Sequence, residues 1–177
     1  MDWEFFESLS ETDARKFLEN FLAVGSKKVP LLVSAAERDG VQADFTIDSI
    51  VPVFQWGISR LTTVPKEPDD TLPDWIRETP SYLENLFEFD EQSKTLLLRM
   101  AYYLGETFVR SFPSLSWDIG NREYAQQNMP VIVGFDKNIE LAPLLVTENT
   151  CGSLKAGPAQ QEDIDVMVKA WTELVRS

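Results

Sequence analysis

The stretch from Leu96 to Phe112, LLLRMAYYLGETFVRSF, constrains the fold more than any other part of this chain. Its apolar residues recur at the spacing of an α-helix, which predicts one helix from about Glu91 to Phe112. Pro113 ends this helix, because the residue before a proline avoids the helical conformation. Gly105 lies inside the helix, where glycine costs roughly 1 kcal/mol relative to alanine. We therefore expect another element to approach the helix closely at Gly105.

A helical wheel separates an apolar stripe on this helix from a polar side. The stripe consists of Leu97, Ala101, Leu104, Phe108 and Phe112. Glu106 lies nearly opposite it, with Arg99 and Arg110 close by. Tyr102 and Tyr103 flank the same polar side. The ion pair expected between Glu106 and Arg110 stabilises a helix by only ~0.2–0.5 kcal/mol. We interpret the charged group as a solvated surface, and its alternatives are a partner-facing surface and a catalytic glutamate.

Further helices are expected before and after the central one. Ser10 begins a helix that Gly25 ends, because glycine often follows the last helical turn. A second helix then covers about residues 27–38, and a third begins near Asp48. The last helix covers about residues 161–176.

The region after the central helix changes to the alternating pattern of β-strands. We predict a short strand within residues 115–120 and a β-hairpin over residues 130–141, which residues 144–147 extend. Residues 151–161 are predicted as a loop of small residues. The fold class is therefore α+β, with helices packed on one face of a small antiparallel sheet. The length fits a single domain over residues 1–177.

The 177 residues include no histidine and one cysteine, Cys151. Without histidine, the Ser-His-Asp and Cys-His arrangements of nucleophilic enzymes are excluded, as is nearly every kind of zinc site. The single thiol also excludes a scaffold held by internal disulfides. The sequence lacks a glycine-rich phosphate loop and an EF-hand loop, and we predict neither a metal nor a cofactor.

The net charge of −13 opposes binding to nucleic acid or to an anionic membrane surface, because both need a basic footprint. It makes a basic protein partner plausible, since opposite charges speed association. The charge alone fits equally a cytosolic protein that its acidity keeps soluble, and that is the interpretation we favour for the charge. No apolar run approaches the ~20 residues of a membrane-spanning helix. The N-terminal MDWEFFESLS has acids where a signal peptide needs basic residues, and we expect a cytoplasmic protein.

The negative charge is concentrated between Lys66 and Glu91. Residues 65–80 are rich in proline and predict a loop, and a short helix is expected at about residues 81–89. The segment from Lys66 to Glu91 contains nine acidic and two basic residues, a net charge of −7. Trp75 lies among the acids, where it either anchors the loop to the body or serves as an interface hot spot. The partner-binding candidates in this segment are Asp69, Asp70, Asp74, Trp75, Arg77 and Glu78. Several of these carboxylates could gather around a cation, but a solvated acidic loop is our interpretation.

Five short motifs occur in an order that resembles a family of uncharacterised bacterial cytosolic proteins. They are DFTIDSIVPVFQW, LPDWIR, AYYLGETFVR, a tryptophan followed by DIG, and QNMPVIVGF. The resemblance covers about residues 15–175, and similar YLGE helices occur among proteins associated with toxin immunity. It assigns no activity. The matching positions are Trp56, Trp75, Arg77, Tyr103, Gly105, Glu106, Trp117, Asn128 and Pro130.

The sequence thus favours a protein-binding module, and in its most concrete form an immunity-type or antitoxin-like inhibitor that covers a basic surface. Outside the acidic segment, the candidate contacts are Arg99, Tyr102, Glu106, Arg110 and Asn128. Two other classes of protein stay open. One is a small carboxylate-based enzyme or small-molecule binder with a pocket near Glu106. The other is a structural adaptor or a homodimer that needs no ligand.

Overall fold

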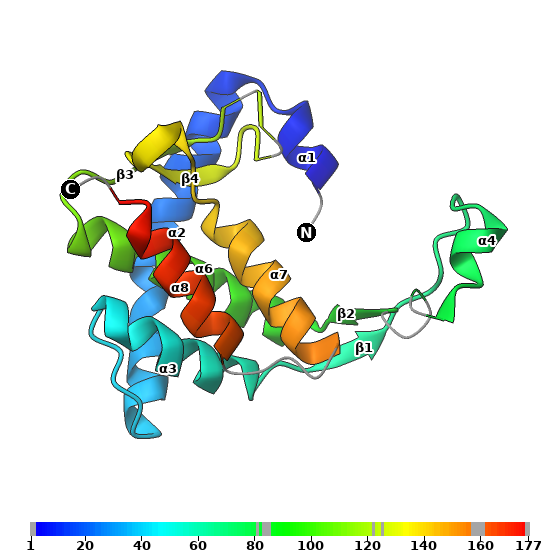
Figure 1. Ribbon diagram of the computed structural model, residues 1–177, viewed down its shortest axis with the longest axis horizontal. Coiled ribbons are helices and arrows are strands. Elements are labelled where there is room, and N and C mark those ends of the chain that lie inside the picture. The colour runs from blue at the N-terminus through cyan, green and yellow to red at the C-terminus, as the bar shows by residue number, and fades with distance from the viewer. Residues whose placement is uncertain are drawn as a thin grey trace.

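Helix α6, Glu91–Ser111, is the element around which most of the chain packs. It contacts α2 (Glu11–Arg38), α3 (Ile47–Ile58) and α7 (Pro143–Ala156) (Figure 1). The shorter helices are α1 (Trp3–Ser8), α4 (Asp74–Arg77) and α8 (Glu162–Glu173). The structure is a computed structural model, and it describes residues 3–80, 82, 86–121, 123–124, 126–156 and 162–175.

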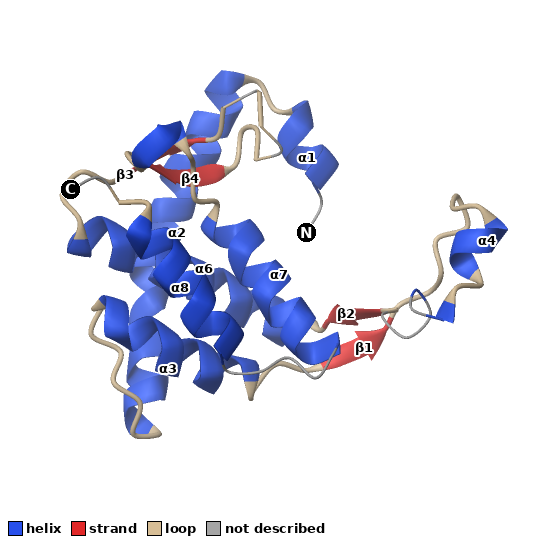
Figure 2. Cartoon of the chain, in the orientation of Figure 1, coloured by secondary structure: helices blue, strands red, loops and turns tan. Residues whose placement is uncertain are grey.

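Two small antiparallel sheets accompany the helices (Figure 2). Strand β1 (Thr63–Pro65) pairs with β2 (Phe87–Phe89), and β3 (Ser116–Ile119) pairs with β4 (Pro130–Val133). The β3–β4 sheet packs against α2, α6 and α7. The predicted α+β class, with helices packed on antiparallel strands, is confirmed, although the strands form two separate pairs.

The predicted bounds of the central helix are confirmed to within one residue. Asp90 caps the N-terminus of α6, where its carboxylate accepts a hydrogen bond from the Ser93 N–H at 2.7 Å. Phe112 leaves the helical conformation just before Pro113, as expected. The apolar stripe from Leu97 to Phe108 is buried.

The expectation that Tyr102 and Tyr103 flank a polar surface is wrong, because both side chains are buried. The ring of Tyr102 packs against Gly25 of α2. The Tyr103 hydroxyl accepts a hydrogen bond from the Phe45 N–H at 3.1 Å and lies 2.6 Å from the Ser49 hydroxyl. Because neighbouring elements surround α6 on several sides, its polar face is narrower than a wheel of one helix indicates.

The predicted break at Gly25 is also wrong, since α2 continues through it from Glu11 to Arg38. A Cβ atom at Gly25 would lie 2.1 Å from Cδ2 of Tyr102, so a glycine here lets α2 and α6 approach each other. Pro30 lies inside this long helix, although proline is tolerated best in a first turn. The burial of the tyrosine outweighs the weak helix preference of one glycine.

The close approach predicted at Gly105 is confirmed. A Cβ atom there would lie 2.2 Å from Cη2 of Trp117 and 3.0 Å from Cγ of Pro143. The indole of Trp117 also contacts the rings of Phe21 and Tyr102. Gly105 therefore lets β3 and the start of α7 lie directly on the central helix.

Two glycine-to-alanine substitutions should have opposite effects on stability. Gly105→Ala should lower the free energy of unfolding by about 1–3 kcal/mol, because the methyl group displaces Trp117. Gly152→Ala, in α7, should raise it by about 0.4–1 kcal/mol, because a Cβ there meets nothing within 4 Å. Urea unfolding of the two variants measures both changes. Equal changes in the two variants would contradict the close packing at Gly105.

The predicted β-hairpin over residues 130–141 is reduced to one bridge between Ile132 and Leu141. The partner of β4 is β3, and residues 136–138 form a 3-10 turn. The predicted extension at residues 144–147 is wrong, because these residues belong to α7. Pro143 suits the first position of that helix, where no N–H is needed. The predicted loop is helical over residues 151–156, and its remainder lies outside the described residues.

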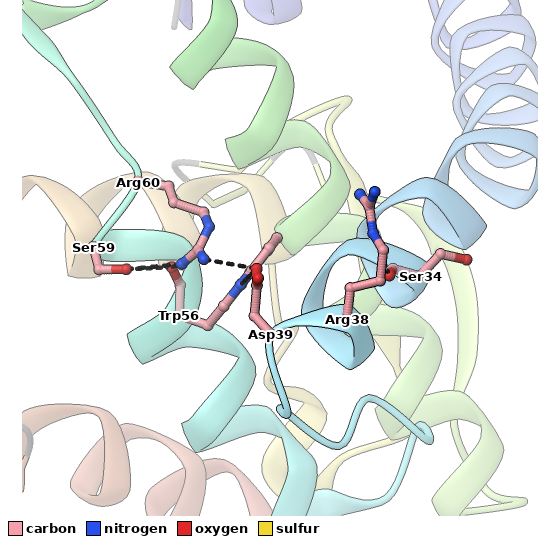
Figure 3. A network of polar contacts seen from close by, with 6 residues as sticks. All are labelled: Ser34, Arg38, Asp39, Trp56, Ser59 and Arg60. Carbon is pink, nitrogen blue, oxygen red and sulfur yellow. Dashed lines mark hydrogen bonds and ion pairs between the residues drawn. The ribbon is translucent and has the colours of Figure 1, made fainter.

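A polar network joins the C-terminal end of α2 to α3 (Figure 3). The Trp56 indole N–H donates to the Asp39 carboxylate at 2.9 Å, and Arg60 pairs with the same carboxylate at 2.7 Å. The Arg60 guanidinium also lies 4.4 Å from the centre of the Trp56 ring. The Trp56 hydrogen bond, followed by the charge of Arg60, lowers the pKa of Asp39. These contacts explain how Trp56 positions α3 against the long helix.

Candidate functional site

Residues 63–80, 82 and 86–89 form an arm that leaves the helical body (Figures 1 and 2). Strands β1 and β2 make its base, and α4 lies near its far end (Figure 1). The three residues of β1 are exposed. The hydrogen bonding between the two strands continues one residue further towards α4, where the Lys66 N–H donates to the Leu86 carbonyl at 3.1 Å. The acidic segment predicted as a loop is therefore mounted on a two-stranded ribbon.

Hydrogen bonds and ion pairs within the arm organise its acids. Arg77 pairs with Asp70 at 3.1 Å and also with Asp74. The Asp69 carboxylate accepts hydrogen bonds from the hydroxyl and the N–H of Thr71, which lower its pKa. The carboxylates of Asp70 and Asp74 stay largely exposed despite their contact with Arg77. The arm therefore carries exposed negative charge on a turn, and the hydrogen bonds and ion pairs within the arm hold that turn in place.

Trp75 is 75% exposed and lies in α4. The expectation that it anchors the loop to the body is therefore wrong. Its indole borders a hollow of about 540 Å³ on the arm, here called the arm hollow. The arm hollow is lined by Lys66, Trp75, Ile76, Thr79, Tyr82, Leu86 and Phe87. Glu78 of the predicted set is also exposed on this part of the arm.

A larger cleft of about 770 Å³, the base cleft, lies where the arm meets the body. Its apolar lining comes from Phe87, Phe89, Leu97, Leu98, Leu144 and Gly152. Its polar lining comes from Lys66, Glu88, Lys94, Glu148, Asn149 and Ser153. Lys94 is paired with Glu91 at 2.9 Å and with Glu88 at 3.4 Å. Lys66 and Phe87 line both the arm hollow and the base cleft, so the two adjoin.

Sequence reasoning missed the base cleft because five of its twelve lining residues come from α7. That segment was predicted as strand and loop, so its side chains could not be placed beside α6. Leu98 was the one local signal, since it is an exposed leucine on an otherwise well-packed helix.

The charged group on α6 is only partly the solvated stripe that we predicted. Glu106 accepts a hydrogen bond from Nε of Arg110 at 2.8 Å, which confirms that pair, but its side chain is only 18% exposed. Arg110 lies 3.9 Å from the centre of the Phe45 ring. Arg99 does not join the pair: the ion pair that Glu106 makes is with Arg110, and among the described residues the buried Nε of Arg99 has no hydrogen-bond partner. Burial, and then the charge of Glu106, raises the pKa of Tyr102.

The remaining candidate, Asn128, is a buried structural contact. Its side-chain N–H group donates to the carbonyls of Phe6 at 3.0 Å and Leu9 at 2.9 Å, which ties the loop before β4 to the end of α1. Its φ of 62° lies in the left-handed region that asparagine tolerates better than most residues. The structure thus separates the eleven candidates into an arm set, an α6 set and this buried amide.

Neither the arm hollow nor the base cleft is lined by Glu106 or Arg99. Within the described residues, no group of three or more His, Cys, Asp or Glu side chains is arranged to hold a metal ion. No helix in the same ranges has both the length and the hydrophobicity needed to cross a membrane.

Cys151 should react very slowly in the folded protein. Its side chain is buried, and burial raises the pKa of the thiol to about 12. At about pH 8, alkylation by iodoacetamide should be about a hundredfold or more slower in the native than in the urea-unfolded chain, because little thiolate forms. The same raised pKa means that this thiol's contribution to stability is lost as pH rises from 9 towards 12. Equal alkylation rates in the two states would contradict the burial.

Comparison with protein-family models, with curated proteins and with solved structures found no match to this chain. The arm, the base cleft and the charge of the chain are therefore the features that point to a function.

Proposed function

We propose that this protein is a binding module that uses its acidic arm to hold a basic protein partner. The observation that carries the proposal is Trp75, which is 75% exposed on an arm that leaves the helical body. Exposing a large aromatic ring to water is unfavourable, and partly exposed tryptophans are enriched among the residues that dominate protein interfaces. Among proteins of this kind, an immunity-type or antitoxin-like inhibitor is the form that we favour.

The charge of the arm supports a basic partner. The exposed carboxylates of Asp70 and Asp74 lie beside Trp75, in a chain whose net charge is −13. Charge of one sign around an apolar anchor speeds association with an oppositely charged surface, while the anchor itself governs how long the complex lasts.

The proposal is tested by capturing partners from the native host with the intact protein and with two charge variants. The arm variant carries Glu67→Gln, Asp70→Asn, Asp74→Asn and Glu78→Gln. Asp69 is kept because it holds the turn at Thr71. The control variant changes the net charge by the same amount at exposed acids of the body, through Glu7→Gln, Glu19→Gln, Glu37→Gln and Glu123→Gln.

We expect the intact protein and the control variant to capture the same basic protein and the arm variant to lose it. Equal capture by all three would contradict a role for the arm. Loss by both variants would indicate that only the total charge matters. Light scattering of the purified protein checks the homodimer class, because a stable dimer would give twice the mass of the chain.

A further inference from the structure

We propose that the open edge of β2 binds an extended segment of the partner as an added β-strand, within the base cleft. This inference rests on the proposed function and names its mode of recognition. An edge strand with unpaired N–H and C=O groups is a template for another strand. In such strand addition, main-chain hydrogen bonds give affinity and alternate side chains give specificity.

The hydrogen bonds at the two ends of the ribbon identify which backbone groups of β2 are free. The Lys66 N–H donates to Leu86 at 3.1 Å, and the Asp90 N–H donates to Thr62 at 3.2 Å. Hydrogen-bonded pairs alternate along an antiparallel ladder, so the next pair between these two is Val64 with Glu88.

Phe87 and Phe89 therefore occupy the alternate positions, and their N–H and C=O groups point away from β1. These groups form no hydrogen bond to any other described residue. The outer edge of β2 thus offers two donors and two acceptors at the spacing that a further strand requires.

The opposite edge of the ribbon is less suited to strand addition. On β1 the outward-facing positions are Thr63 and Pro65. Proline has no N–H group, so one of the two donors is missing from that edge. The ribbon is accordingly protected on β1 and open on β2, which makes β2 the edge for a specific partner.

The base cleft gives an added strand room and a second wall. Phe87, Glu88 and Phe89 all line it, while β1 does not contribute. The facing wall comes from α7, through Leu144, Glu148 and Asn149 among others. Its volume of about 770 Å³ falls within the range typical of ligand clefts. A strand lying there would occupy the space between β2 and α7.

The side chains around this space define the sequence that fits. Leu97, Leu98 and Leu144 provide an apolar wall, which suits apolar residues at every second position. Two lysines line the cleft: the positive charge of Lys94 is balanced by Glu88 and Glu91, and that of Lys66 acts on Asp69 of the arm. The arm beyond carries a marked excess of acids. The segment that fits best is an extended chain in which apolar residues alternate with lysine or arginine.

The test uses the full-length protein and a short capped peptide of alternating lysine and valine. Amide hydrogen exchange, followed by NMR, reports on each backbone N–H. We expect the amides of Phe87 and Phe89 to exchange about tenfold or more slowly with the peptide than without it. The Glu88 amide, already paired with β1, should change little. The same peptide N-methylated at every residue has neither edge available for the ladder and should give no protection.

Two substitutions at Phe87 separate the contribution of its backbone N–H group from that of its side chain. Phe87→Pro removes one outward N–H and should abolish the peptide-induced protection of Phe89, whereas Phe87→Ala keeps the N–H and should retain most of it. The spectrum of each free variant shows whether the ribbon is intact, and the N-methylated peptide tests the same point without any substitution.

The outcomes for the edge and for the arm are distinguishable. No protection of Phe87 and Phe89 at millimolar peptide, or equal protection by the N-methylated peptide, would overturn strand addition. The arm could still capture a partner in that case, through Trp75 and its acids. If the peptide protects the Phe87 and Phe89 amides but no partner is captured, strand addition at β2 is supported and the proposed function is refuted.

Discussion

Replacing Phe108 by alanine should lower the free energy of unfolding by about 3–5 kcal/mol, the range typical of a phenylalanine removed from a packed core. The ring is fully buried on the central helix. It contacts Phe112 and Phe135, each with its ring centre 6.0 Å away. Its loss leaves a cavity at the point where α6 meets the segment that follows β4. Urea unfolding, with the slope of the transition checked for change, measures the effect.

Leu31→Ala is the matched control for this large effect. Leu31 lies on α2 with 52% of its surface exposed, so the substitution should change stability by less than about 0.5 kcal/mol. A small effect at Phe108, or a similar effect at the two positions, would show that α6 is not the centre of the core.

Replacing Trp75 by alanine should weaken binding to the partner by about 2 kcal/mol or more, roughly thirtyfold in Kd, because hot-spot tryptophans contribute on this scale. The free energy of unfolding should stay within about 0.5 kcal/mol of its original value, since the side chain is mostly exposed. Binding is measured by surface plasmon resonance with the captured partner. We expect the change mainly in the dissociation rate.

Two further variants define what the indole contributes. Trp75→Phe keeps an aromatic ring and should recover part of the affinity. Tyr124→Ala removes another exposed aromatic, 45% exposed and outside the arm, and should leave binding unchanged. If Trp75→Ala binds like the original protein, Trp75 is not the anchor and the proposed function loses its main support.

Regular helical patterns with matching end signals were predictable from sequence. The central helix has a repeated apolar stripe, a capping aspartate at Asp90 and a proline just beyond its end. These signals lie within a few turns of one another, so they act on the backbone whatever the rest of the chain does. The close approach at Gly105 was predictable for the same reason, because glycine inside a helix calls for a packing contact.

Tertiary contacts determined the end of α2 and the pairing of β4, which the sequence patterns did not predict correctly. Gly25 looks like a helix end, but the ring of Tyr102 fills the space beside it and α2 continues. The alternating residues over 130–141 resemble a hairpin, yet β4 pairs with β3, the strand that precedes it. In each case the deciding partner lies outside the local pattern, and the pattern alone does not identify it.

The candidate site was divided in the same way. The sequence by itself determined that negative charge and a tryptophan occur together between Lys66 and Glu91, and that histidine-based catalysis is absent. Only the tertiary structure decided that this segment is an arm, that Trp75 is exposed, and that β2 borders a cleft against α7. Composition and local spacing belong to the chain alone. The exposure of a side chain and the position of a cleft depend on which distant segments pack against each other, and only the tertiary structure determines this packing.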